Sequence, residues 1–134
     1  MRLGIDLVRV KAIEGSVRRF GERFLRRVYT PGELADCGER DILALSQGIQ
    51  RAQVVRLAAR FAAKEAVMKI LRPADVALPW QSIEVRSELS GVCRVELHRE
   101  AHALAAAIGI HSIEISLTHE QDYAAAIAVG RISR

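Results

Sequence analysis

One long helix-forming stretch constrains the fold of this chain more than any other feature. From about Arg51 to Leu71 the sequence holds neither glycine nor proline and is rich in Ala, Leu, Val and Arg, and Pro73 follows it. A stretch of this kind predicts a single helix of about six turns that ends before the proline. In a chain of 134 residues the remaining elements must be arranged around that helix.

Short segments of alternating polarity predict the strands. They are residues 3–8, 82–87, 92–97, 112–118 and 123–129. A turn at Ser90-Gly91 joins the second and third strands, and the loop 119–122 joins the last two, so these neighbours should pair as antiparallel hairpins. No linker, repeat or low-complexity tract interrupts the sequence. We therefore expect one domain over residues 1–134, of the α+β class, with a small, mainly antiparallel sheet wrapped around one long helix.

The shorter helices carry their own start and stop signals. A helix over residues 11–27 should break or bend near Gly15 or Gly21, and one over residues 98–108 should stop at Gly109. A further short helix begins at Thr30-Pro31-Gly32-Glu33, where Thr30 and Glu33 form a capping box. Residues 41–50 are ambiguous, with a break at Gly48.

Composition excludes several classes of protein. Half of the residues are hydrophobic, which favours a globular chain over a disordered one. We expect no signal peptide and no membrane span, because no apolar run reaches about 18 residues. Cys37 and Cys93 are too few for a disulfide framework, which favours a cytoplasmic location.

The net charge of +4 is concentrated in basic side chains early in the chain, among them Arg18, Arg19 and Arg23. Such a surface attracts an anionic partner, although a solvated helix face is the simpler interpretation. Phe20 and Phe24 are spaced i, i+4 and should pack inward, so the aromatic side chains that nucleic-acid binders often expose are lacking. We expect an acidic protein partner and no nucleic acid.

Two carboxylates stand where apolar residues would be expected. Asp6 interrupts the first strand; if the Leu3 face of that strand meets the core, Asp6 projects from the opposite face. Glu65 lies at the edge of an expected buried stripe that includes Leu57, Phe61 and Met68. An ordinary ion pair with Lys69 would explain Glu65 alone. If the two carboxylates converge, they suit a hard divalent cation that holds a phosphorylated substrate.

Two histidine-containing segments are further candidate sites. His98 and His102 are spaced i, i+4, but Arg99 stands where the zincin pattern has glutamate and no third ligand is evident, so a metal site is not expected there. Ser116 and Thr118 share a strand face and His119 lies at the strand end, which is either a surface hairpin or part of a site.

Several motifs in this order resemble the holo-acyl-carrier-protein synthases, the small 4′-phosphopantetheinyl transferases. The motifs are Gly4-Ile5-Asp6-Leu7, Tyr29-Thr30-Pro31-Gly32-Glu33-Leu34, Arg60-Phe61-Ala62-Ala63-Lys64-Glu65-Ala66 with Lys69, Ile83-Glu84-Val85, and Ser116-Leu117-Thr118-His119 with Tyr123-Ala124-Ala125-Ala126. The resemblance covers nearly the whole chain. It implies transfer of 4′-phosphopantetheine from coenzyme A to a serine of an acyl carrier protein, with release of adenosine 3′,5′-bisphosphate.

The resemblance also implies roles for individual residues. Asp6 and Glu65 would ligate Mg²⁺, Lys69 would contact phosphate and stabilise the leaving group, and either Glu65 or a water on the metal would accept the serine proton. Coenzyme A contacts are expected from Arg60, Lys64 and His119. Arg72 stands where the family commonly has a Gly-Thr-Gly turn, and it would bind phosphate instead. The acidic carrier protein would dock on Arg18, Arg19 and Arg23.

Short members of this family form trimers with clefts between subunits, so a homotrimer is expected. The missing Gly-Thr-Gly turn hints weakly at a polyketide carrier rather than one of fatty acid biosynthesis. Two alternatives stay open: a non-catalytic basic module that binds acidic proteins or nucleic acid, and a degenerate family member that binds coenzyme A without transferring.

Overall fold

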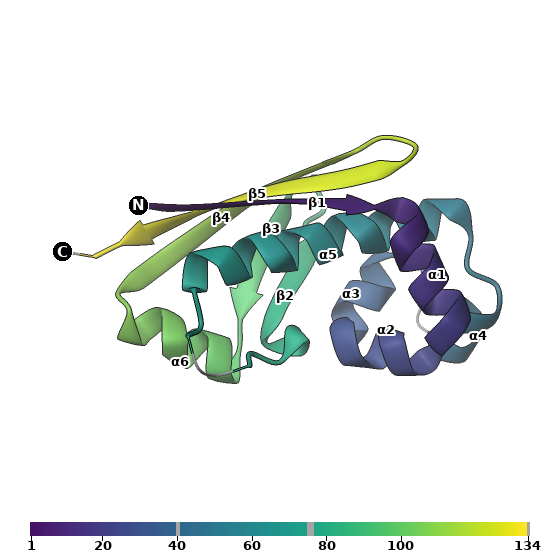
Figure 1. Cartoon of the computed structure of the whole chain (residues 1–134), viewed down its shortest axis with the longest axis horizontal. Helices are drawn as coiled ribbons and strands as arrows, with labels where there is room; N and C mark the ends of the chain where they lie inside the picture. Colours follow the sequence, from purple (N-terminus) through teal and green to yellow (C-terminus); the bar gives the residue numbers. More distant parts are fainter. Residues whose placement is uncertain (40, 75–76, 134) are drawn as a thin grey trace.

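The long helix lies at the centre of the molecule (Figure 1). The computed structural model describes residues 1–39, 41–74 and 77–133, and this helix, α5 (Arg51–Leu71), has the bounds that the sequence predicts. Along one side of α5 runs a three-stranded antiparallel sheet in the order β1 (Arg2–Arg9), β5 (Tyr123–Ile132), β4 (Ile110–His119). β1 is therefore hydrogen-bonded to β5, the strand that comes latest in the sequence among the three.

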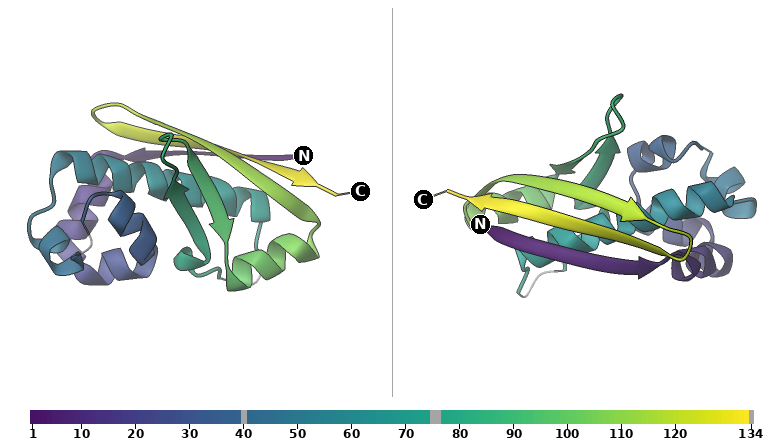
Figure 2. Two further views of the ribbon diagram at one scale, coloured as in Figure 1. Left: turned by 180° about the vertical axis from the view of Figure 1, so that it is seen from behind. Right: turned by 90° about the horizontal axis from the view of Figure 1, so that it is seen from above.

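A second sheet covers a different side of α5. It consists of the antiparallel pair β2 (Ile83–Ser87) and β3 (Cys93–Leu97), seen in front of α5 in the left view of Figure 2. The 3₁₀ turn η1 (Trp80–Ser82) precedes β2, and α6 (Arg99–Ala107) follows β3. The predicted α+β class with antiparallel strands around one long helix is therefore confirmed, with two small sheets in place of one.

Four short helices gather at the N-terminal end of α5 (Figure 1). They are α1 (Val10–Phe20), α2 (Glu22–Val28), α3 (Pro31–Asp36) and α4 (Ile42–Gln47). The break between the first two falls at Gly21, whose φ of 57° is a conformation that glycine adopts readily. The capping box of α3 is present: the side chain of Thr30 accepts from the backbone N–H of Glu33, and that of Glu33 accepts from Thr30. The ambiguous segment contains α4, capped by Asp41 and ended at Gly48.

The expected face of β1 was wrong, and two other expectations about side-chain faces hold only in part. The Leu3 face of β1 does not meet the core: Leu3, Ile5 and Leu7 are 61%, 67% and 65% exposed, and Gly4, Asp6 and Val8 face inward. The predicted stripe of α5 holds in part: Leu57 is fully buried and Glu65 is partly buried at the edge, but Phe61 and Met68 are also only partly buried. Phe20 is half exposed and does not pack inward, whereas the ring of Phe24 meets that of Tyr29 edge-on.

Within the described ranges, no helix combines the length and the apolar character needed to cross a membrane.

Candidate active site

The close approach of β1 to α5 creates the candidate site. A Cβ atom on Gly4 would overlap the carbonyl oxygen of Ala66, so only glycine lets the strand lie directly against the helix. Two residues further along the same face of β1 is Asp6, which therefore also points at α5. The Gly-Ile-Asp motif thus has a geometric basis. Its glycine lets β1 lie against α5, and its aspartate is thereby placed next to the helix.

On α5 the residues that meet Asp6 are Glu65 and Lys69. The Nζ atom of Lys69 donates to Asp6 Oδ1 at 3.2 Å and to the carbonyl oxygen of Ile5 at 2.6 Å. The ordinary ion pair with Lys69 that would have explained Glu65 alone is replaced by this cross-link from helix to strand. Asp6, Glu65 and Lys69, which the sequence singled out from two distant segments, are thereby brought together.

The electrostatics of this cluster show that the two carboxylates influence each other. Partial burial raises the pKa of Glu65 above its ordinary value, and the negative charge of Asp6 raises that pKa further, while Lys69 lowers it. The two acids are therefore near enough to repel each other, and one ammonium offsets the repulsion only in part. A pair of carboxylate oxygens in this situation offers the ligand type that a hard divalent cation prefers.

Lys64, the residue before Glu65, lies in a different environment. Its side chain is fully buried and forms an ion pair of 2.7 Å with the equally buried Glu33. The Nζ atom also donates to the carbonyl oxygens of Ile83 at 2.6 Å and Trp80 at 3.0 Å. Burial lowers the pKa of Lys64 and raises that of Glu33, and in each case the partner's charge opposes the shift. In this chain Lys64 joins α5 to α3 and β2. Its contact with coenzyme A stays a prediction, and the burial of its side chain does not favour that contact.

Arg60 is likewise a core residue, at 5% exposure. Its guanidinium donates to Ser87 Oγ at 2.5 Å and to the carbonyl oxygen of Arg56 at 3.3 Å, on the side of α5 that faces β2. The structure does not bring Arg60 to the acidic pair, so its predicted coenzyme A contact remains a prediction.

The other two predicted coenzyme A contacts are exposed. Arg72 caps the C-terminus of α5 with φ = 48°, one turn beyond Lys69. His119 ends β4 and lines a hollow of about 310 Å³ together with Leu7, Thr118 and Tyr123. In the strand register His119 is level with Ala124 and Val8, two strands away from β1, and no hydrogen bond or ion pair joins it to Asp6 among the described residues.

Comparison with known proteins identifies the architecture. The sequence model of the 4′-phosphopantetheinyl transferase superfamily matches residues 2–128. A holo-[acyl-carrier-protein] synthase from Moorella thermoacetica is 42% identical over 129 residues, which cover 96% of this chain and 92% of that one. The chain belongs to the 4′-phosphopantetheinyl transferase superfamily and is an enzyme of that class.

Solved transferases of this superfamily share the fold. The complex of the Chronobacterium ammoniagenes synthase with coenzyme A superposes with a TM-score of 0.81 at 27% identity, covering 98% of this chain and 97% of that one. The Helicobacter pylori synthase in complex with coenzyme A gives 0.77 at 26% identity, covering 97% and 100%. The resemblance drawn from the motifs is thus confirmed along nearly the whole chain.

Sequence reasoning missed a second polar cluster of the transferase, formed by Glu84, Glu96 and His98. A signal for part of it was available. Glu84 and Glu96 are equally distant from Ser90 in the predicted turn, so an antiparallel hairpin closed there must set them opposite each other.

Proposed function

We propose that this transferase moves 4′-phosphopantetheine from coenzyme A to a serine of an apo acyl carrier protein in a Mg²⁺-dependent reaction. The single observation that carries the proposal is the convergence of Asp6, Glu65 and Lys69 from β1 and α5. In support, the similar Helicobacter pylori and Chronobacterium ammoniagenes synthases bind coenzyme A, and the Moorella thermoacetica relative is a holo-[acyl-carrier-protein] synthase.

The residues present fit a magnesium ion. Asp6 and Glu65 would hold it, because both are carboxylates and the pKa of Glu65 is raised by burial and by Asp6, a repulsion that a cation relieves. Bound there together with the pyrophosphate of coenzyme A, Mg²⁺ would neutralise negative charge on the phosphates.

The chain's own groups account for the remaining chemistry. The serine Oγ of the carrier protein forms a bond to the phosphorus that bears the pantetheine arm, and the bond from that phosphorus to adenosine 3′,5′-bisphosphate breaks. The ammonium of Lys69, exposed at the edge of the site, stabilises the charge on the departing phosphate. Glu65 accepts the serine proton, a role open to a partly exposed carboxylate beside the reacting phosphate.

The test is transfer by variants that lack one carboxylate. Asp6→Ala and Glu65→Ala should each lower the rate at least about 100-fold, because each removes a charge at the reacting phosphate. The gain in mass of an apo carrier protein, incubated with coenzyme A, Mg²⁺ and each variant, measures this rate. Glu100→Ala, at an exposed glutamate on α6, is the matched control and should transfer normally.

Full transfer by both variants would contradict the assignment of the site. A protein that binds neither coenzyme A nor Mg²⁺ in calorimetry would favour the non-catalytic basic module instead. One that binds coenzyme A but never modifies any of several carriers would be a degenerate transferase.

The docking surface for the carrier protein is proposed on α1 and α2. Arg18, Arg19 and Arg23 are exposed, and Phe20, Arg23, Phe24 and Arg27 line a shallow hollow of about 550 Å³. Basic side chains around a partly exposed aromatic ring suit an acidic helical partner, with charge steering the encounter and the ring providing apolar contact.

Arg23→Glu should weaken carrier binding about fivefold, since a surface ionic contact contributes about 1 kcal/mol, and the loss should grow at low salt. The apparent affinity for the carrier, measured at two ionic strengths, tests this. Arg51→Glu, at an exposed arginine that begins α5, is the control. An affinity unchanged by Arg23→Glu at low salt would remove this surface from the proposal.

We also propose that the transferase is a homotrimer. The right view of Figure 2 looks onto the outer face of the three-stranded sheet, where Leu3, Ile5 and Leu7 lie beside Ile127 and Val129. Monomeric proteins seldom expose a contiguous apolar surface of this kind, which supports burial against another subunit. A cytoplasmic location likewise stays a prediction from the sequence.

A further inference from the structure

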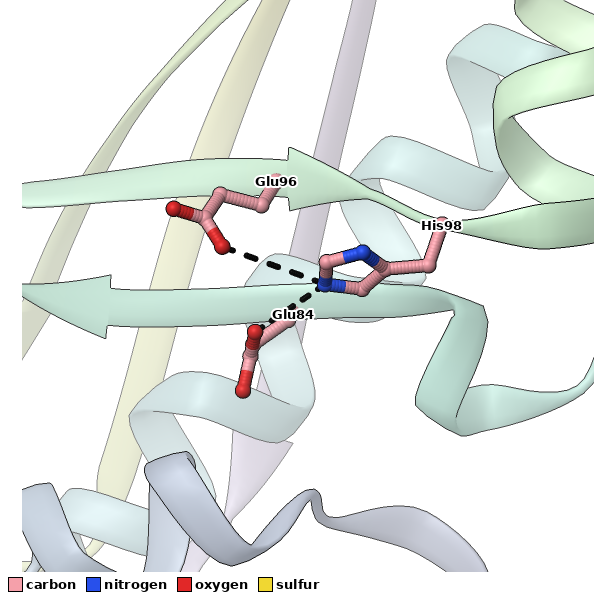
Figure 3. A group of neighbouring side chains, drawn as sticks. All are labelled: Glu84, Glu96 and His98. Carbon is pink, nitrogen blue, oxygen red and sulfur yellow. Dashed lines mark hydrogen bonds and ion pairs between the residues drawn. The ribbon is translucent and has the colours of Figure 1, made fainter.

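Three side chains of metal-binding type converge on the β2–β3 sheet, at the end away from the hairpin turn (Figure 3). Glu84 belongs to β2, Glu96 to β3, and His98 directly follows β3. His98 Nε2 lies 3.0 Å from Glu84 Oε1 and 3.9 Å from Glu96 Oε2. One donor atom from each residue lies within 4.8 Å of the others. No part of the proposed transfer reaction uses these residues.

The strand register sets two like charges against each other, and Arg86 and Arg94 offset this repulsion from outside the cluster. Glu84 and Glu96 are directly opposite each other in the antiparallel pair. Like charges in that position destabilise a sheet, because the two side chains project from the same face at short range. His98 is two residues beyond Glu96 and so projects on that face as well. The chain therefore sets two carboxylates and an imidazole around one point.

The carboxylates are held by groups outside the cluster. The hydroxyl of Thr30, at the start of α3, donates to Glu84 Oε2, and Arg86 Nη1 lies 4.0 Å from that same oxygen. Arg94 pairs with Glu96 Oε1. Each glutamate thus has one oxygen anchored and presents the other to His98. Carboxylates that ligate metals are commonly held in this way by a second hydrogen bond.

We propose that Glu84, Glu96 and His98 bind a divalent transition-metal ion, with Zn²⁺ as the expected ion. Imidazole nitrogen and carboxylate oxygen are both zinc ligands, whereas Mg²⁺ strongly prefers oxygen alone. Bonds of about 2.0–2.2 Å in a tetrahedron place the donor atoms about 3.4 Å apart. The observed 3.0 and 3.9 Å require only small side-chain movements.

Water completes the coordination, because the site is open on one side. The side chains of His98 and Glu96 are 42% and 40% exposed, while that of Glu84 is 11% exposed. The bound ion fastens the end of β3 to β2 and, through Glu84 and Thr30, to the start of α3. The site shares no residue with Asp6, Glu65 and Lys69, so it acts on the stability of the transferase rather than on the transfer step.

The experiment is a titration of the full chain with Zn²⁺, followed by calorimetry, with Co²⁺ absorption as a second readout. Asp6→Asn serves as the starting protein, because it weakens competing binding at the carboxylate pair on β1 and α5. We expect one Zn²⁺ per chain and a rise in thermal stability. In that protein, His98→Ala and Glu96→Gln should each weaken Zn²⁺ binding at least about tenfold, since even loss of a group behind a ligand costs that much.

The matched control is His102→Ala. His102 is an exposed histidine on α6 that lines a separate hollow with His111, so its removal should leave the affinity unchanged. If His98→Ala fails to fold, Glu96→Gln decides, because that change keeps the shape of a half-exposed side chain. The proposal is overturned if the starting protein binds no Zn²⁺, or if Glu96→Gln binds it as tightly as the starting protein does.

Discussion

Lys64 and Glu65 are consecutive residues of α5, yet they lie in opposite kinds of environment. Successive residues of a helix point about 100° apart, so Lys64 faces α3 and β2 while Glu65 faces β1. Lys64 is fully buried, and its ammonium is satisfied by Glu33 and two carbonyl groups. Glu65 is partly exposed beside a second carboxylate, and its charge is not fully balanced. One turn of helix therefore faces the core on one side and the proposed active site on the other, so motif residues need not all touch substrate.

The largest expected effect on stability is that of Lys64→Ala. This change leaves the carboxylate of Glu33 buried without its cation, which should lower the free energy of unfolding by about 3–5 kcal/mol. Urea denaturation followed by circular dichroism measures it. Glu65→Ala is the control one residue away and should change stability by less than about 1 kcal/mol, since partly exposed polar groups contribute little. Equal losses from the two variants would abolish the distinction between the two sides of α5.

A smaller effect is expected for Gly4→Ala, which disturbs only the side of α5 that faces β1. The new methyl group meets the backbone carbonyl of Ala66, so β1 must move away from the helix, at a cost of about 1–3 kcal/mol. Transfer activity should fall with it, because Asp6 moves away from Glu65. Gly15→Ala provides the control: a Cβ there meets no atom within 4 Å, so stability and activity should be preserved. Normal activity in Gly4→Ala would show that the close contact does not position Asp6.

The smallest effect concerns the titration of Glu65 itself. Burial raises its pKa first and Asp6 raises it further, so Asp6→Asn should lower the pKa of Glu65, as read from its carboxyl carbon by NMR. Because the folded-state pKa lies above the unfolded one, wild-type stability should decline as pH rises through the folded-state pKa of Glu65, and Asp6→Asn should reduce that decline. A pKa that does not move in Asp6→Asn would mean that the two carboxylates do not interact.

The sequence predicted the elements well because their signals are local. The bounds of α5 follow from an uninterrupted helical stretch before Pro73, and the start of α3 follows from Thr30 and Glu33. The two hairpins follow from short turns between alternating segments. The pairing of Asp6 with the Glu65 region could also be predicted, because an acidic residue in an otherwise apolar strand or helix needs a partner.

The faces were harder to predict because they depend on distant parts of the chain. Alternation in β1 defines two faces but not which one meets α5, and the more apolar face turned outward. The rule that apolar residues point inward fails where a sheet keeps an apolar surface uncovered within one chain. Lys64 could not be recognised as a core residue either, because its burial depends on Glu33, which reaches it from another helix.

The sheet order has a consequence for how the protein is made. Within the described part of the chain, β1 is hydrogen-bonded to β5 alone, so the earliest strand to leave the ribosome pairs with the latest. Helices α1 to α5 can form while synthesis continues, but β1 obtains its strand partner only after β5 has emerged. Asp6 is therefore fixed opposite α5 late in folding, and a nascent chain that still lacks β5 holds Glu65 and Lys69 without Asp6 beside them.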